Sequence, residues 1–176
     1  MLDGMALDII ILSVLRAAPV HGYELKRRVQ RPTLSPLSNN SLYPYLRRFE
    51  QAGAVTKTVE EHEGRPARNV YAITDVGRRM LTDLISTLPL EQAGNDEEFL
   101  VRLSFFGEIA PANRTAILAA RAAVLDGAIA QVRTLLGESE PSPEREWRNL
   151  AMGQLLERLH SERSWIATLT EKASEK

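Results

Sequence analysis

Residues 55–73 read VTKTVEEHEGRPARNVYAI, and this stretch decides the fold. Both of its ends alternate apolar with polar side chains and are rich in β-branched residues, as in strands that are buried on one face. Between the ends, residues 63–66 (EGRP) supply residue types that favour a turn. The stretch therefore predicts a β-hairpin that carries Arg65 and Arg68 near its tip.

Two helices are predicted ahead of the hairpin. Residues 6–17 (ALDIIILSVLRA) are apolar around nearly the whole circumference of a helix, which indicates a buried helix. The same run would suit a buried strand, but its length favours a helix. Residues 21–29 place Leu25 and Val29 one helical turn apart, opposite a basic face, which is typical of a short amphipathic helix.

A third helix is predicted from the capping residues at 38–41 to Gly53. Pro44 falls in or just after its first turn, where a missing N–H costs little. One face of this helix is an apolar stripe formed by Leu42, Leu46 and Phe49. Another face carries hydrogen-bonding groups and positive charge, and it consists of Asn40, Tyr43 and Arg47.

After the hairpin, Thr74 and Asp75 have the residue types that cap a fourth helix, which Pro89 ends. We expect its buried face to be formed by Val76, Met80, Leu84 and Leu88. The predicted order is helix, helix, helix, hairpin, helix, which is the order of a winged helix-turn-helix domain. We predict such a domain, with a DNA-binding role, over residues 1–90.

Residues 91–176 predict a separate α-helical domain, and the acidic segment 91–98 is the boundary that the sequence favours. Helices are expected at 99–106, from 110 to 136, and from about 144 to 170. In the last helix, apolar residues recur at the spacing of a helix–helix seam: Trp147, Leu150, Ala151, Leu155, Leu159, Ile166 and Leu169. A helix of ~25 residues is near 38 Å long, which is too long to bury within a domain this small. We therefore expect a homodimer, and a chain that is mainly α with a small β-hairpin.

Composition and charge restrict the function classes. The chain has no cysteine, which excludes disulfides and thiolate chemistry and fits a cytoplasmic protein. No unbroken apolar run approaches the ~18 residues that a membrane span needs, and no basic leader opens the sequence. Residues 1–90 carry a net charge of +3 and residues 91–176 carry −4. The first half is therefore the one expected to meet a polyanion.

Neither an enzyme nor a metal or cofactor site is expected. The three histidines, His21, His62 and His160, lie far apart, and no pair has the spacing of metal ligands. No glycine-rich phosphate loop or strand–turn–helix elbow frames a nucleophile. We expect His21 to cap the second helix and Gly22 to allow a close approach between elements.

The third helix of a winged helix enters the major groove, where base edges differ. Asn39 or Asn40 can pair with adenine, and Tyr43 can touch a thymine methyl group or a phosphate. Arg47 can reach guanine or a phosphate, and arginines of the wing can meet phosphates or a minor groove. The candidate DNA contacts are Asn39, Asn40, Ser41, Tyr43, Arg47, Lys26, Arg27, Arg65 and Arg68. Helix capping by the asparagines, core packing of Tyr43 and a solvated hairpin tip are the competing interpretations.

Trp147 and Trp165 are candidates for an effector cavity, because flat aromatic ligands stack on indole rings. The competing interpretation is that both rings pack in a helix–helix core or a dimer seam, where large aromatic side chains usually pack. The sequence leaves both interpretations open.

Three stretches together resemble the PadR family of bacterial transcription regulators. They are HGYEL at 21–25; SLYP at 41–44, followed by LRRFE at 46–50 and Gly53; and GRP at 64–66 with Arg68, Tyr71, Ile73-Thr74 and Gly77-Arg78. Their order and spacing match the family across about residues 7–80. The second half resembles, by helix pattern and size, the longer helical extension of one subgroup of the family.

The resemblance implies a homodimer that represses transcription by binding an inverted-repeat operator and is released by a small hydrophobic or aromatic effector. This sequence differs from the usual family pattern at two places that concern DNA binding. Asn40-Ser41 stands where family members often carry a glycine with Ser or Thr, and Ala67 interrupts a wing tip that is often more basic. These departures imply an altered base preference and a weaker phosphate contact. Two other classes compete: a protein-interaction module on a winged-helix scaffold, and a ligand-binding protein or enzyme with a vestigial DNA domain.

Overall fold

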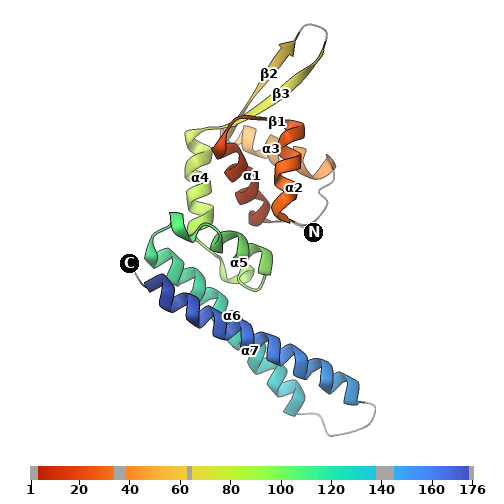
Figure 1. Ribbon diagram of the computed structural model, residues 1–176, viewed down its shortest axis with the longest axis vertical. Coiled ribbons are helices and arrows are strands. Elements are labelled where there is room, and N and C mark those ends of the chain that lie inside the picture. The colour runs from red at the N-terminus through yellow and green to blue at the C-terminus, as the bar shows by residue number, and fades with distance from the viewer. Residues whose placement is uncertain (1–3, 34–38, 63–64, 138–144, 175–176) are drawn as a thin grey trace. The chain divides into compact units, whose positions relative to one another are not determined.

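The computed structural model describes residues 4–33, 39–62, 65–137 and 145–174. The chain forms two compact units, Met1–Ile85 and Ser86–Lys176 (Figure 1). The first unit contains α1 (Met5–Ala17), β1 (Val20–His21), α2 (Gly22–Thr33), α3 (Asn39–Gln51), β2 (Val55–His62), β3 (Arg65–Ile73) and α4 (Asp75–Ser86). The predicted winged-helix order and the mainly helical class are confirmed.

The wing is the predicted hairpin with one added strand. Strands β2 and β3 pair in antiparallel fashion from Val55 opposite Ile73 outward to His62 opposite Arg65, so both strands are longer than their alternating segments indicated. Strand β1 adds to β3, which gives a three-stranded sheet in the order β1-β3-β2. Strand β1 was not predicted, because two residues are too few to show an alternating period.

The core of the first unit forms where the apolar faces of its helices meet. Helix α1 buries residues around most of its circumference, as expected of a central helix, and they are Ala6, Leu7, Ile9, Ile10, Ile11, Leu12 and Leu15. The predicted apolar positions of the next two helices are also buried, namely Leu25, Val29, Leu42, Leu46 and Phe49. Each fully buried side chain of this size contributes about 1.5–3 kcal/mol to stability. This packing fixes which face α3 leaves to solvent.

Helix α4 is joined to the end of α3 by a tight contact that rotates its buried face away from the predicted one. Thr74 caps α4 as expected: its hydroxyl donates to the carbonyl of Gly53 at 2.6 Å and accepts from the amide of Gly77 at 3.2 Å. A Cβ atom on Gly77 would overlap the carbonyl oxygen of Ala54, so the backbones touch there. The buried residues of α4 are therefore Gly77, Leu81 and Ile85, while Leu88, which was also predicted to be buried and is buried, lies beyond the end of the helix. Val76, predicted to be buried, is 40% exposed.

Helix α3 ends as predicted, and its proline lies just after the first turn. Gly53 follows the helix with φ of 69°, a left-handed conformation that glycine adopts readily after a helix C-terminus. Pro44 lies inside the helix, at the sixth of its 13 residues. Pro44 therefore lies just after the first turn, within the predicted range. Since Pro44 has no N–H, the carbonyl of Asn40 lacks its usual helical partner.

The second unit is built on a helical hairpin. It contains η1 (Leu90–Gln92), α5 (Asp96–Leu103), η2 (Phe106–Glu108), α6 (Pro111–Gly137) and α7 (Glu146–Ser174), and α6 and α7 lie side by side (Figure 1). The helical prediction is confirmed, but α5 begins three residues before the predicted start at 99. The reason is Asn95, whose side-chain oxygen accepts from the amides of Glu97 at 2.8 Å and Glu98 at 3.3 Å.

A buried arginine ties the helices of the second unit together. Arg121 of α6 is 3% exposed and donates to Glu162 of α7, to Asp96 of α5 and to the carbonyl of Ala93, at 2.5 to 2.8 Å. Its guanidinium group also lies 5.4 Å from the ring centre of Phe99. The buried charge is therefore balanced by carboxylates and a carbonyl of the same unit, as burial of a charge requires.

Among the described residues, one helix, α6, is long and apolar enough to cross a membrane by length and composition, with a mean hydropathy of 1.4 over its best window. It contains no unbroken apolar run of that length, because charged residues interrupt it. One of them is Arg121, which forms the buried ion pairs just described. Helix α7 packs against α6. Length and composition of one helix are weak evidence for a membrane span, and 33% of this stretch is buried within the second unit.

Candidate nucleic-acid interface

Helix α3 presents a polar face to solvent opposite its buried stripe. Tyr43 is 54% exposed, and Arg47, one turn further on, is exposed as well. Tyr43 does not pack in the core, so that competing interpretation is wrong. Asn39, Asn40 and Ser41 lie in the first turn of α3, but their side chains fall outside the described residues. The described part of the face offers a phenol hydroxyl and a guanidinium group, both of which suit contact with DNA.

The two neighbouring arginines of α3 have different surroundings. Arg48 forms an ion pair with Asp8 of α1, and its guanidinium group lies 4.9 Å from the ring centre of Tyr45. Arg47 has no such contact within the described part of the chain. Arg48 is therefore a structural residue that joins α3 to α1, whereas Arg47 is available to a ligand.

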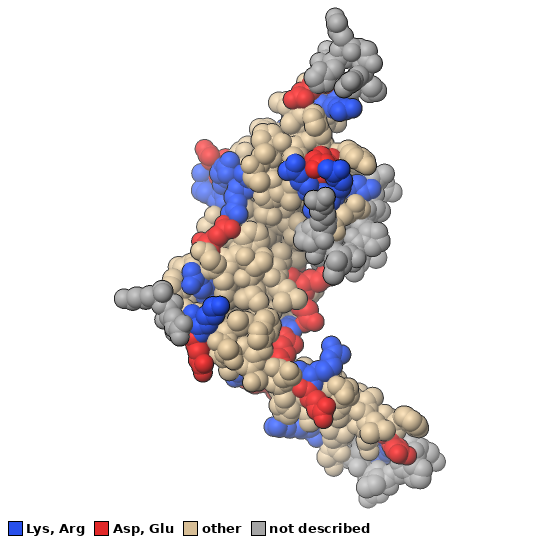
Figure 2. Space-filling model, viewed as in Figure 1, with Lys and Arg blue, Asp and Glu red and all other residues tan. Residues whose placement is uncertain are grey.

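The basic face of α2 is largely paired within the helix. Glu24 accepts from Arg28 at 2.8 Å and from Arg27 at 2.8 Å. The hydrogen bond from Arg28 and that from Arg27 lower the pKa of Glu24 below its ordinary value, so the carboxylate stays charged. Figure 2 shows Lys and Arg side chains mixed with acidic ones over this helix. Arg27 therefore offers a partly compensated charge, and Lys26 is half-buried.

On the wing, Arg68 lies three positions into β3 and is exposed. It stands opposite Glu60 in the strand register. Arg65 begins β3 opposite His62, but the side chains of both residues fall outside the described residues. Arg68 is therefore three residues from the outer end of β3 and five residues from Ile73 at the base of the wing.

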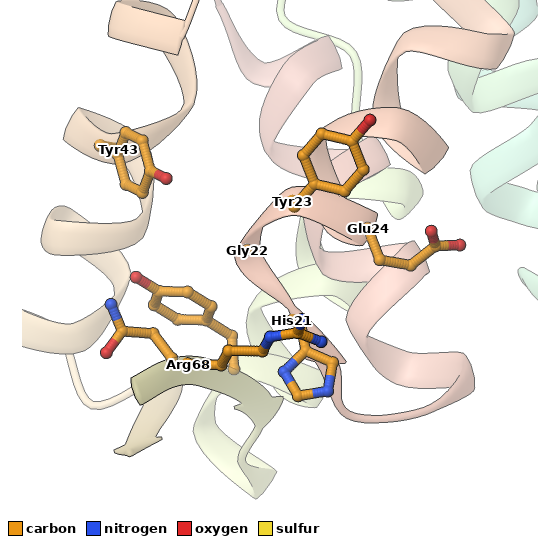
Figure 3. A pocket seen from close by; sticks show the side chains of 8 residues that line it. His21, Gly22, Tyr23, Glu24, Tyr43 and Arg68 are labelled. Carbon is orange, nitrogen blue, oxygen red and sulfur yellow. The ribbon is translucent and has the colours of Figure 1, made fainter. Parts of the chain in front are cut away.

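A cavity of about 460 Å³ lies where α2, α3 and the wing meet (Figure 3). It is lined by His21, Gly22, Tyr23, Glu24, Tyr43, Arg68, Asn69 and Tyr71. Gly22 forms part of the wall, and a Cβ atom there would lie 3.3 Å from the ring of Tyr71 and 3.9 Å from the hydroxyl of Tyr43. The close approach expected at Gly22 is thus confirmed, and its nearest neighbour is Tyr71. Burial raises the pKa of Tyr71, which keeps that phenol neutral.

The prediction that His21 caps α2 is wrong. It belongs to β1, its Nδ1 atom is buried with no hydrogen-bond partner among the described residues, and its Nε2 atom lies 3.8 Å from Oε2 of Glu60. The ring is oriented toward the wing because the β1 backbone pairs with β3. No group of three or more metal-ligating side chains is present among the described residues.

Tyr23 and Asn69 were not predicted as members of this site. Tyr23 is 80% exposed at the start of α2, and Asn69 is exposed beside Arg68. The available signal was a large aromatic side chain on the polar face of a short amphipathic helix, where burial gives no reason for it. Asn69 had no such signal, because an asparagine in a strand is ordinary.

The two candidate effector residues are far apart on one helix. Trp147 is 79% exposed, and Trp165 is 42% exposed with its ring edge-on to Phe99 at 6.2 Å. Eighteen residues of helix separate them, which is about 27 Å. One small cavity within a single chain therefore cannot contain both indoles.

Comparison with known proteins identifies a family. Residues 11–83 match the transcriptional regulator PadR-like family. A putative transcriptional regulator from Thermoplasma acidophilum is 32% identical over 44% of this chain and 72% of its own, with a TM-score of 0.40. One from Clostridium thermocellum is 27% identical over 45% of this chain and 78% of its own, with a TM-score of 0.41. PadR of Bacillus subtilis in complex with operator DNA is 20% identical over 96% and 99%, with a TM-score of 0.43. No curated protein matches the sequence significantly.

Proposed function

The chain belongs to the PadR-like family of transcriptional regulators, and from this premise we propose that it binds operator DNA through the first unit, with α3 in the major groove. The observation that carries the proposal is the exposed face of α3. Tyr43 and Arg47 are displayed there by a helix whose other side is fixed in the core. Asn39, Asn40 and Ser41 would extend this face to the start of the helix. Base contacts from such a rigid element give sequence preference, and phosphate contacts give register.

The residues around α3 would contact the DNA backbone. We assign this role to Arg65 and Arg68 of the wing and to Lys26 and Arg27 of α2. The internal pairing of Arg27 with Glu24 implies that α2 adds less to the electrostatic attraction than its basic residues suggest. Most of the salt dependence would then come from α3 and the wing.

We propose that the protein acts as a homodimer on an inverted repeat, with residues 1–90 as the DNA-binding domain and 91–176 as the dimerisation domain. Support comes from α7, which has 29 residues and is therefore about 44 Å long. Its outward face exposes large apolar side chains, including Trp147 at 79% and Leu150 at 58%. Such exposure on a long helix is typical of a surface that a partner covers.

We further propose repression in the cytoplasm, with release by a small hydrophobic or aromatic effector. A structure of PadR from Bacillus subtilis was solved in complex with p-coumaric acid. In this chain Trp165 is the better placed candidate, because its indole packs against Phe99 and is still partly exposed. A Trp147→Phe variant leaves Trp165 as the one remaining tryptophan, so its fluorescence reports binding near α7. An effector that releases DNA without changing this fluorescence would remove Trp165 from the site.

The first experiment measures binding of the purified protein to the DNA upstream of its own gene and to a scrambled duplex, at two salt concentrations. We expect preference for the upstream duplex and an affinity that falls steeply with salt. The control is Arg79→Ala, which removes one exposed positive charge from α4, outside the proposed interface. If neither this duplex nor any member of a random duplex library binds, the proposal is overturned. A protein-interaction module on a winged-helix scaffold would then be favoured.

A further inference from the structure

We propose that a second cavity, which lies where the start of α5 meets α6 and α7, binds a small zwitterion with an apolar side chain, a ligand of the class of the apolar amino acids. The ammonium group of this ligand would bind Asp96 and Glu162, and its carboxylate would bind Arg158. The inference goes beyond the proposed function, because it assigns to the second unit a ligand site with named charges. It does not depend on DNA binding, so the two can fail separately.

The cavity lies within the second unit and has a volume of about 220 Å³. Pockets for drug-sized ligands measure about 300–1,000 Å³, so this one suits a smaller molecule. Half of its wall is apolar and comes from the facing sides of the helical hairpin, namely Val124, Leu125, Ala128, Leu155 and Leu159. These side chains would cover the apolar part of the ligand.

The remaining wall carries carboxylates whose charge is only partly balanced. Arg121 donates to one oxygen of each carboxylate, Oδ1 of Asp96 and Oε1 of Glu162. The second oxygen of each accepts no hydrogen bond from the described part of the chain. Two carboxylates thus share one guanidinium group, which leaves one negative charge uncompensated. The buried Arg121 holds both carboxylates at the cavity, where an ammonium group can donate to their second oxygens.

A positive charge also lines the cavity without a partner. Arg158 is exposed, and it lies four residues before Glu162 on α7, a spacing at which Arg and Glu often form an ion pair. Among the described residues it forms neither an ion pair nor a hydrogen bond. Its guanidinium group is therefore available to a carboxylate, and the planar pair of donors that it offers matches the two oxygens of one.

Unpaired charges of both signs around one cavity determine the class of ligand. A cation would leave Arg158 without a partner, and an anion would leave the second oxygens of Asp96 and Glu162 without a donor. A zwitterion satisfies both sides and adds no net charge to a cavity whose four charged residues already balance. The apolar wall then favours an apolar side chain over a polar one.

The test is a calorimetric titration of the full-length protein, without DNA. The probes are L-valine, L-leucine and L-methionine, together with 3-methylbutylamine, which is leucine without its carboxylate, and 4-methylpentanoate, which is leucine without its ammonium group. We expect leucine to bind, and each analogue to bind at least about tenfold more weakly, because each loses one charge-assisted contact. If none of the three amino acids binds at up to about 10 mM, the proposal is overturned.

Two variants identify which residue meets which end of the ligand. Arg158→Gln should weaken leucine binding about tenfold and leave 3-methylbutylamine unaffected, because that probe has no carboxylate to lose a partner. Asp96→Asn should weaken leucine binding and leave 4-methylpentanoate unaffected. The matched controls are Lys172→Gln on α7 and Glu97→Gln on α5, which remove the same charges at exposed positions outside the cavity and should bind leucine like the parent.

A third variant tests the location. Ala128→Leu fills part of the cavity and should weaken leucine binding, whereas Ala130→Leu, at an exposed position of the same helix, should not, with equal helical content by circular dichroism. Equal leucine binding by both variants would place the ligand elsewhere and overturn the proposal. If 4-methylpentanoate binds as tightly as leucine and Asp96→Asn has no effect, the cavity takes a simple carboxylic acid and the zwitterion is wrong. Each of these results leaves the proposed DNA binding untouched.

Discussion

Arg48 of α3 and Asp8 of α1 form an ion pair across 40 residues of sequence, while the adjacent Arg47 is exposed and forms no ion pair among the described residues. The two arginines are one residue apart, so about 100° of helix rotation separates a structural role from a binding role. The sequence LRRFE does not distinguish them without the phase of the buried stripe. This pair therefore gives an internal comparison for testing which surface of α3 meets DNA.

Arg47→Ala should weaken binding to the operator by about 1–3 kcal/mol if the side chain reads a base, and should leave the melting temperature unchanged. Arg48→Ala should lower stability by about 1 kcal/mol, because the guanidinium group is 57% exposed whereas the Asp8 carboxylate that would lose this partner is 13% exposed. Its effect on operator affinity should be smaller than that of Arg47→Ala. Gel shift or calorimetric titration measures the first effect and thermal unfolding the second. Equal losses of affinity from both variants would mean that charge alone matters, and that α3 does not read bases through Arg47.

Gly77→Ala should destabilise the first unit strongly, because its Cβ atom would overlap the carbonyl oxygen of Ala54, a backbone atom that cannot turn away. We expect a loss of at least about 2 kcal/mol in the free energy of unfolding, a size typical of core overpacking. Gly127→Ala is the control. It lies within α6, a Cβ atom there would meet no atom within 4 Å, and alanine should stabilise the helix by about 0.5–1 kcal/mol. Denaturant titration of both variants measures these two changes in the free energy of unfolding. A Gly77→Ala protein as stable as the parent would contradict this close contact.

The sequence was sufficient to predict an element wherever one local pattern determined its structure. The hairpin, the stripe of Leu42, Leu46 and Phe49, and the glycine after α3 each follow from period, burial and turn chemistry. It was insufficient wherever a tertiary contact decided the outcome. Which face of α4 is buried depends on the contact between Gly77 and Ala54. Strand β1 forms because its two residues pair with the edge of β3, and two residues are too few to show a strand pattern in the sequence. The cavity beside Tyr43 joins three elements, so no single segment carries its signature.

Arg121→Met should cost about 3–5 kcal/mol, because it leaves the carboxylate of Glu162 and the buried carbonyl of Ala93 without their donor. Arg163→Met is the matched control. Arg163 also links α7 to α6, through Asp126 at 2.8 Å, but that pair is exposed and should contribute less than about 1 kcal/mol. Chemical denaturation followed by tryptophan fluorescence measures both, since Trp165 packs on Phe99 beside Arg121. Similar losses in the two variants would show that burial does not set the difference.

Leu150→Glu should weaken the dimer without unfolding the chain. Leu150 is 58% exposed on the outward face of α7, so a glutamate there disturbs little of the packing within the unit. In a dimer that covers this face, the charge would lose its water and have no partner, which costs several kcal/mol. The control is Gln131→Glu, which adds the same charge at an exposed position of α6.

Sedimentation velocity over a range of protein concentrations should show a monomer for Leu150→Glu and a dimer for the control, with equal helical content by circular dichroism. A Leu150→Glu protein that remains a dimer at the same concentrations would place the interface on another surface of the second unit. Operator affinity should fall together with dimerisation, since each half-site would then be bound by one recognition helix alone.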